Sequence, residues 1–385
     1  MAQPVLGILT LYLNDAGLLE ERPVYQKMTL AGQQLGLDVF VFTPDDVNYQ
    51  TNRIHAHVYY PKLKTWHREW RAFPTMIFDR CRIQRSPRFE RLQQFRKQYG
   101  HLFFLNRMLR NKWTVYRTLR LESQFRDHLP ETRLYESQSD LSELIRKYPL
   151  VYLKPITGTG GRGILRIEKQ KDGTYLIQGR EHNRKIIRPQ RVPLSSLHAR
   201  LASWDLKGNR YLVQQGIQLK LASGRVHDYR MLVQKNGNGE WAVTGCAGRI
   251  GPSGSITSNL HGGGEAIPMT DLMRQWLQDE EIEEAAKAEA ESFSLEVAAH
   301  LEASYGRLCE LALDLAIDKK GHIWLIEVNP KPAREVFKQI GDQETYQTAI
   351  TRPLEFALWM YEQKQQRKAA AAAIKRSNDK KAGSR

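Results

Sequence analysis

The sequence predicts a mixed α/β and α+β chain, in which a small parallel-sheet unit precedes two units whose strands pair through short turns. Its 385 residues exceed what one hydrophobic core usually serves, which favours two or three packed units. Strand-like and helix-like stretches alternate over the first hundred residues, whereas short strand-like runs separated by turn signals dominate the later part. The composition, 41% hydrophobic and 26% charged, excludes a disordered or collagen-like chain.

The first unit is predicted over residues 1–110. Pro4–Leu13 and Val39–Thr43 are apolar runs typical of buried strands, and the stretch between them has helical periodicity from Pro23 to Leu35. Thr75–Asp79 has the composition of a further short strand. A strand, a helix and a strand in this order indicate a small α/β domain built on a parallel sheet.

Two further units are predicted over residues 111–215 and 216–365, followed by a basic tail over 366–385. Residues 270–309 are acidic and have the spacing of an amphipathic helix. The tail contains the alanine run Ala369–Ala373 and then mostly basic residues, a low-complexity composition for which we expect disorder.

The charge is strongly basic and unevenly distributed. The net charge is +16, with 21 Lys and Arg against 9 Asp and Glu in residues 51–150, but 3 against 11 in residues 271–310. Such a distribution favours an anionic partner (a nucleotide, nucleic acid, a membrane surface or an acidic polymer), unless it only solvates the surface. Nucleic acid is the less favoured partner, because the aromatic residues within the basic stretch Arg80–Arg110 have a helical spacing that directs them into a core.

Neither export nor a membrane span is expected. No apolar run approaches the roughly 20 residues that a bilayer requires, and residues 1–12 lack the features of a signal peptide. The cysteines are far apart and form no zinc-binding spacing, which is typical of a reducing compartment and predicts a cytoplasmic protein. They are Cys81, Cys246 and Cys309.

A glycine-rich loop connects two predicted strands. Gly158, Gly160 and Gly163 form a GxGxxG pattern, but residues 164–168 alternate like a strand, whereas a dinucleotide-binding fingerprint requires a helix there. The chain also lacks the HRD and DFG motifs of protein kinases. The remaining interpretations are an ordinary hairpin with a flexible tip and a flap whose backbone N–H groups hold phosphates beside Lys154.

Three oxygen-bearing side chains are predicted to converge near the C-terminal end of the chain. Asp314 lies in an apolar strand, where an unpaired carboxylate is unfavourable. Glu327 and Asn329 are two residues apart, so they project to the same side of an extended segment. Hard oxygen ligands of this kind are typical of a magnesium site, although an ion pair between Asp314 and a Lys or Arg is the alternative.

Together these features resemble the ATP-grasp superfamily, and within it the YheC/YheD-like endospore coat-associated branch. The resemblance covers nearly the whole chain and depends on the order of its motifs rather than on any one of them. The motifs are Asn111-Lys112, Tyr152-Leu153-Lys154-Pro155, the glycine loop, Asp228-x-Arg230, Arg249, Asn259 before a glycine run, Asp314, and Glu327-x-Asn329.

The resemblance implies an ATP-grasp fold, in which two α+β lobes clamp ATP behind a small α/β pre-ATP-grasp domain. It also implies a role for each matching residue. The implied lysines on the phosphate and adenine side are Lys112 and Lys154, the flap is Gly160, Gly161 and Gly163, and the adenine hinge is Gln214, Gln215 and Ile217. The implied catalytic residues are Arg230, Arg249 and Asn259, with both arginines on the triphosphate or an acyl phosphate, and the implied metal ligands are Asp314, Glu327 and Asn329.

The expected function is that of an ATP-dependent carboxylate–amine or carboxylate–thiol ligase that forms an acyl phosphate. Its cofactors would be ATP and Mg²⁺, or Mn²⁺ in place of Mg²⁺, and its carboxylate and amine substrates are not identified by the sequence. The alternative is a non-catalytic ATP-binding component of the spore coat that docks on coat proteins or an anionic polymer. By the same resemblance, the expected location is the cytoplasm of the mother cell, in association with the endospore coat.

Overall fold

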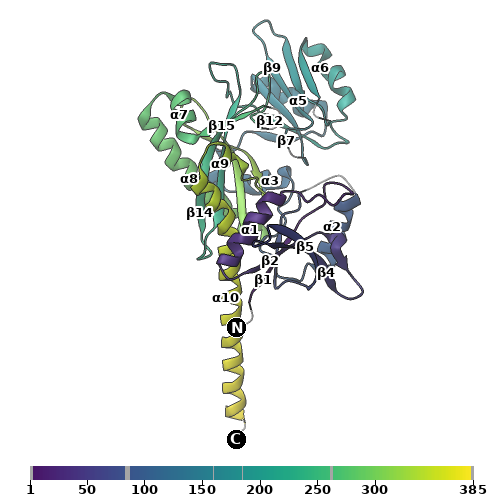
Figure 1. Cartoon of the computed structure of the whole chain (residues 1–385). Helices are drawn as coiled ribbons and strands as arrows, with labels where there is room; N and C mark the ends of the chain where they lie inside the picture. The colour runs from purple at the N-terminus through teal and green to yellow at the C-terminus, as the bar shows by residue number, and fades with distance from the viewer. Residues whose placement is uncertain (1–2, 83–86, 159, 184, 261–262, 383–385) are drawn as a thin grey trace.

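The protein is built on three β-sheets with helices packed around them, as the computed structural model shows (Figure 1). The structure describes residues 3–82, 87–158, 160–183, 185–260 and 263–382, with only the backbone described for 375–382.

The first sheet has a parallel centre. Its elements are β1 (Val5–Leu9), α1 (Arg22–Gln34), β2 (Asp38–Phe42), the 3-10 turn η1 (Pro44–Asp46), β3 (Val47–Asn48), β4 (Arg53–Tyr60), β5 (Thr65–Ala72), β6 (Met76–Asp79) and α2 (Pro87–Tyr99). The strand order is β3-β4-β2-β1-β6, with β5 paired to β4, and β1 is parallel to both β2 and β6. The carboxyl ends of β1, β2 and β6 therefore share one edge, where open α/β sheets bind their ligands.

The second sheet is antiparallel and has the order β11-β10-β9-β8-β12-β7. Its elements, with the helices that accompany them, are α3 (Lys112–Leu121), α4 (Ser123–Arg126), β7 (Thr132–Leu134), α5 (Gln138–Lys147), β8 (Leu150–Pro155), β9 (Ile164–Lys169), β10 (Tyr175–Arg180), β11 (Ile186–Val192), α6 (Leu194–Leu201), the 3-10 turn η2 (Ala202–Trp204) and β12 (Tyr211–Gln215). The glycine loop joins β8 to β9, so it connects two paired strands as the sequence predicts.

The third sheet is also antiparallel, in the order β15-β14-β13-β16-β17. Its elements are β13 (His227–Lys235), β14 (Trp241–Ile250), β15 (Glu265–Pro268), α7 (Met269–Leu277), α8 (Glu280–Tyr305), β16 (Glu310–Ile317), β17 (Ile323–Asn329), α9 (Glu335–Gln339) and α10 (Gln343–Ala382). The acidic helix expected over 270–309 is divided in two, because Gln278 is left-handed, with a φ of 61°, and Asp279 caps a new helix by accepting from the Ile282 N–H at 3.1 Å.

The expected disorder of the tail is not what the structure shows for residues 366–382, since α10 continues as a helix to Ala382, while residues 383–385 lie outside the described part of the chain. The physical reason is composition: alanine has the highest helix propensity, and the lysines and arginines on either side of Ala369–Ala373 are also good helix formers. The lower part of α10 extends beyond the rest of the molecule (Figure 1). Among the described helices, none is long and apolar enough to cross a membrane.

A buried charge network joins the first and third sheets. Arg80, directly after β6, forms ion pairs with Glu310 on β16 and, at 2.7 Å, with Glu21. Glu310 also pairs with Arg334, and the side chains of Arg80, Glu310 and Arg334 are all fully buried. Because a buried charge must be paired, these contacts fix the carboxyl edge of the parallel sheet against the third sheet.

We therefore predict that Glu310→Gln destabilises the protein strongly. The substitution leaves two buried guanidinium groups without their shared carboxylate, which should lower the free energy of unfolding by about 3 kcal/mol or more. Urea unfolding measures this difference. Glu136→Gln is a suitable control, because Glu136 is exposed and forms no ion pair among the described residues, so a change within about 0.5 kcal/mol is expected. Equal stability of Glu310→Gln and wild type would contradict the role of this network.

Candidate functional site

Acidic and basic side chains form a row across three strands of the third sheet. Asp314 on β16 lies opposite Arg230 on β13 and opposite Glu327 on β17. Directly opposed residues share one face of a sheet, so these three side chains project together. Asn329, two residues after Glu327, joins them and donates from Nδ2 to Asp314 Oδ2 at 3.3 Å. The structure thus brings together the three predicted metal ligands.

Two arginines neutralise Asp314. Arg230 donates from Nε to Oδ1 at 2.6 Å and from Nη2 to Oδ2 at 3.1 Å, and Arg249 lies 3.1 Å from the same Oδ2. Burial alone would raise the pKa of Asp314, but the two guanidinium groups outweigh it and hold that pKa below its usual value. Arg249 also donates from Nε to Asp228 Oδ1 at 2.7 Å. The carboxylate is therefore ionised and held in one orientation.

Two lysines lie close to this row. Lys112, the first residue of α3, is 3.5 Å from Glu327 Oε1, while Lys154 on β8 donates to Gln214 Oε1 at 2.6 Å. Burial lowers the pKa of Lys154 to about 8, and the nearby Lys112 acts in the same direction. The carboxylates of Glu327, Asp314 and Asp228 oppose this shift, so Lys154 is within electrostatic reach of the third sheet. Lys112 on α3 and Lys154 on the second sheet thus lie near the carboxylates of the third sheet.

The glycine loop contacts the segment between β14 and β15 of the third sheet. Gly160, Gly161 and Gly163 have φ values of 70°, 71° and 66°, a left-handed conformation that glycine adopts without strain. A Cβ added to Gly161 would lie 2.8 Å from Asn259 Nδ2, so the loop and Asn259 are in close contact. Tyr152, on the strand before the loop, also donates to the Ile256 carbonyl at 3.3 Å.

The three predicted hinge residues have different surroundings. Gln214 is buried and bridges Lys154 and Thr132, to which its Nε2 donates at 3.0 Å. The side chain of Gln215 accepts from the Glu131 N–H at 3.0 Å, so it is engaged in local structure. Within the described chain, no hydrogen bond involves the N–H or carbonyl of Ile217. Of the three, Ile217 therefore has the backbone groups that are free to bind a planar base.

The oxygen-bearing side chains fit a divalent cation. A carboxylate oxygen has two lone pairs, and Asp314 Oδ1 accepts only one hydrogen bond, from Arg230. Among the residues that the structure describes, Glu327 Oε1 has only the 3.5 Å contact with Lys112. Because hard cations such as Mg²⁺ take carboxylate and amide oxygens, the residues that would hold such an ion are Asp314, Glu327 and Asn329.

Two residues of the site, Asp228 and Lys331, have no role assigned to them from the sequence. Asp228 pairs with Arg249 and thereby orients it, and its spacing before Arg230 was the available signal. Lys331, two residues after Asn329, lies 2.7 Å from Asp79 at the end of β6. No sequence signal indicates this second contact, because the two residues are 252 positions apart.

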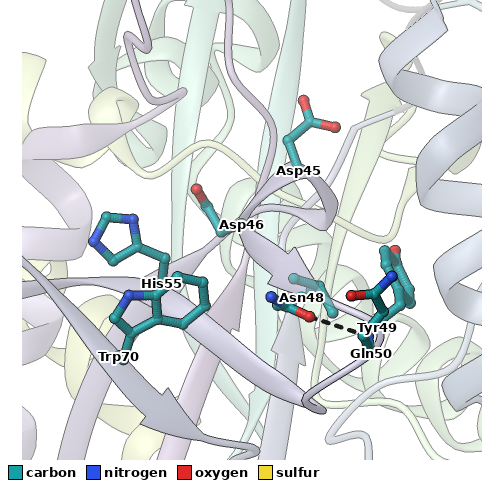
Figure 2. A pocket seen from close by; sticks show the side chains of 8 residues that line it. Asp45, Asp46, Asn48, Tyr49, Gln50, His55 and Trp70 are labelled. Atoms are coloured by element: carbon teal, nitrogen blue, oxygen red, sulfur yellow. Dashed lines mark hydrogen bonds between the residues drawn. The ribbon is translucent and has the colours of Figure 1, made fainter.

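A separate pocket of about 500 Å³ lies on the first sheet (Figure 2). His55 and Trp70 stack on one side of it, with ring centroids 4.9 Å apart, and Asp45 and Asp46 line another side. Its carboxylates are already paired, Asp45 with Arg91 and Asp46 with Arg68, and none of the predicted site residues lines it. The candidate site is therefore the cluster between the second and third sheets.

Comparison with known proteins identifies a matching family model and related proteins. The family model described as YheC/D like ATP-grasp matches residues 101–360. The endospore coat-associated protein YheC of Bacillus subtilis (strain 168) is 28% identical over 344 residues, which cover 87% of this chain and 91% of the relative. The endospore coat-associated protein YheD of the same organism is 26% identical over 370 residues, which cover 93% of this chain and 79% of the relative.

Solved structures with the same fold are ligases and synthetases. The D-cycloserine synthetase DcsG has a TM-score of 0.52 and 12% identity, with 93% of this chain and 99% of that chain covered. The D-alanine-D-alanine ligase from Coxiella burnetii has a TM-score of 0.50 and 10% identity, with 96% of this chain and 99% of that chain covered. At these identities the similarity concerns the fold alone. It confirms the fold class predicted from the sequence.

We predict that Asp314→Asn lowers stability in a pH-dependent way. At neutral pH the variant leaves Arg230 and Arg249 without this carboxylate, which should lower the free energy of unfolding by about 3 kcal/mol. The pKa of Asp314 is depressed in the folded state, so its contribution is complete above its unfolded pKa of about 3.9 and is lost as the pH falls through the folded value.

In urea unfolding, the free energies of unfolding of wild type and Asp314→Asn should thus differ by a constant amount between about pH 7 and pH 5. The two values should converge in more acidic solution. Asp271→Asn is the matched control, because Asp271 is exposed and lies 3.5 Å from its arginine partner, so little change is expected. A difference that stays the same down to about pH 3 would refute the ion-pair explanation.

Proposed function

The chain belongs to the YheC/D-like ATP-grasp family, and on this basis we propose that it binds ATP with a divalent cation and acts as an ATP-dependent carboxylate–amine ligase. The observation that carries the proposal is that Lys112 lies 3.5 Å from Glu327 and that Lys154 is within electrostatic reach of Asp314 and Glu327. A triphosphate between them would meet cations on one side and metal-holding carboxylates on the other. We further propose residues 1–110, 111–215 and 216–365 as the pre-ATP-grasp domain and the two lobes.

Each part of the site has a defined task in this proposal. The left-handed glycines let backbone N–H groups approach phosphate oxygens, while Lys112 and Lys154 supply positive charge. Ile217 offers its backbone N–H and carbonyl to adenine. A divalent cation held by the carboxylates would neutralise charge on the transferred phosphoryl group.

The proposed reaction has two steps. A carboxylate oxygen of the substrate attacks the γ-phosphorus, the bond to the β,γ-bridging oxygen breaks, and ADP leaves behind an acyl phosphate. An amine nitrogen then attacks the acyl carbon, inorganic phosphate departs, and the nitrogen loses a proton to form an amide. Arg230 and Arg249 are the side chains that would orient and neutralise the phosphoryl oxygens, so the rate would come from positioning and electrostatics.

We predict that ADP binding weakens as the pH rises through the pKa of Lys154. Only the protonated ammonium attracts phosphate, and this pKa is lowered by burial to about 8. In calorimetric titrations with ADP and Mg²⁺, affinity should fall by up to about tenfold per pH unit above that value.

Lys154→Arg should flatten this profile, because a guanidinium stays protonated, and Lys154→Met should bind weakly at every pH. Lys171→Met, in an exposed turn, is the control that should follow wild type. A wild-type profile that does not change up to about pH 9.5 would remove Lys154 from the phosphate site.

Turnover is tested with carboxylate substrates labelled with ¹⁸O, in mixtures that also contain an amine. We expect ADP release that requires both substrates and Mg²⁺, with one ¹⁸O transferred from the carboxylate to inorganic phosphate. Glu327→Gln should abolish this release, and Glu136→Gln should not.

A second candidate, a non-catalytic ATP-binding coat component, is favoured by the coat association in the names of both relatives. Tight ATP binding without ADP release for any substrate pair would support it over the ligase. Release of phosphate without ¹⁸O would exclude the acyl phosphate.

A further inference from the structure

The C-terminal part of α10 is a helix without a partner. Residues 366–374 are exposed at every position, and Ile374 has 63% of its surface accessible. Figure 1 shows this part projecting away from the three sheets, with no other element beside it. Residues 366–382 would extend roughly 25 Å as a helix. Its alanine-rich composition favours the helix by itself, and its exposed sides are available for contact with another surface.

The charge of this segment indicates what the surface must be like. Residues 366–382 contain six lysines and arginines and one aspartate. Among the described side chains of the helix, Lys364, Arg367 and Lys368 form no ion pair with a carboxylate, and all three line a groove of about 680 Å³ where α10 leaves the body. Arg307, in the same groove, has a lowered pKa because of burial and the neighbouring arginines Arg107 and Arg367. An acidic surface would relieve this repulsion.

The exposed side of α8 has the complementary charge. Residues 279–296 contain eight aspartates and glutamates and a single lysine. Glu280, Glu281, Glu284 and Glu296 are exposed, and none of them pairs with a described lysine or arginine. Between these acids, Ala285 and Ala288 are also exposed, so a second helix could approach closely.

The two helices have opposite charge along comparable lengths. Basic pairs follow one another at positions 367–368, 375–376 and 380–381, with intervals of eight and five residues. On α8, the exposed glutamates Glu281, Glu284 and Glu296 extend over residues 281–296. Two antiparallel helices would therefore bring the basic segment beside the acidic one, with Ala369–Ala373 against the small residues of α8.

We propose that the projecting part of α10 packs along α8 of a second copy of this chain. Glu302, near the end of α8, lines the groove at the base of this segment, but the projecting part of α10 points away from the acidic residues 279–296 of its own molecule (Figure 1). Two different surfaces meet in this contact. If two molecules exchange their helices, the assembly is a closed dimer, and otherwise each molecule binds a further one and an open array forms. The proposal does not depend on ATP or on the proposed ligase reaction.

The test is the oligomeric state of the full chain as a function of salt. In sedimentation velocity at about 50 mM NaCl, wild type should have at least twice the 44.6 kDa mass of one chain, and at about 1 M NaCl it should be a monomer. Arg367→Glu with Lys368→Glu should be a monomer at both salt concentrations, and so should Glu281→Lys with Glu284→Lys. All four substitutions in one chain should restore association, because the charges are exchanged.

Circular dichroism and melting temperature serve as folding controls for these variants, since all four positions are on the surface. A wild type that is monomeric at low salt overturns the proposal, and so does a four-substitution chain that stays monomeric. Monomeric wild type that binds heparin through Arg367 and Lys368 would also overturn it and would assign α10 to an anionic polymer.

Discussion

The site depends on one buried carboxylate, Asp314, whose charge is balanced by two arginines. In a low-dielectric strand an isolated carboxylate would become protonated, and a protonated carboxyl could neither hold a cation nor orient a guanidinium. Arg230 and Arg249 prevent this, and Asp228 in turn holds Arg249. The four side chains form a neutral unit of two positive and two negative charges. The charges of this unit therefore balance without a ligand.

The sequence predicts those relations within the site that lie along one strand, but not those between strands far apart in the chain. Glu327 and Asn329 are two residues apart on one strand, and Lys154 ends a strand beside the glycine loop, so their relations are local and visible in the sequence. The pairing of Arg230 with Asp314 joins residues 84 positions apart, and the sequence contains both without indicating that they are opposed. The sequence left open a metal site or an ion pair at Asp314. The structure contains the ion pair, within a group of oxygens that also fits a cation.

The fold was predictable where elements are buried and periodic. The strands around Val5 and Val39 are nearly continuous apolar runs, and they form the parallel centre of the first sheet. The hairpin of β4 and β5 was missed, because its exposed strand contains Trp66, Arg68 and Trp70 in a basic stretch that does not resemble a core strand. The tail was predicted wrongly for a related reason: low complexity indicates weak tertiary packing, but alanine favours a helix even without it.

Contacts between distant segments also connect the metal-ligand candidates to the first sheet. Asn329 ends β17, and two residues later Lys331 lies 2.7 Å from Asp79 at the carboxyl end of β6. Arg80, the next residue after Asp79, also donates to the carbonyl of Pro332 at 2.8 Å. The segment from Asn329 to Pro332 is therefore held by the first sheet on one side and by the carboxylate row on the other. Both groups of contacts act on the same four residues, so a movement of the first sheet would displace Asn329. The geometry of the candidate cation site is therefore coupled to the edge where α/β sheets bind ligands.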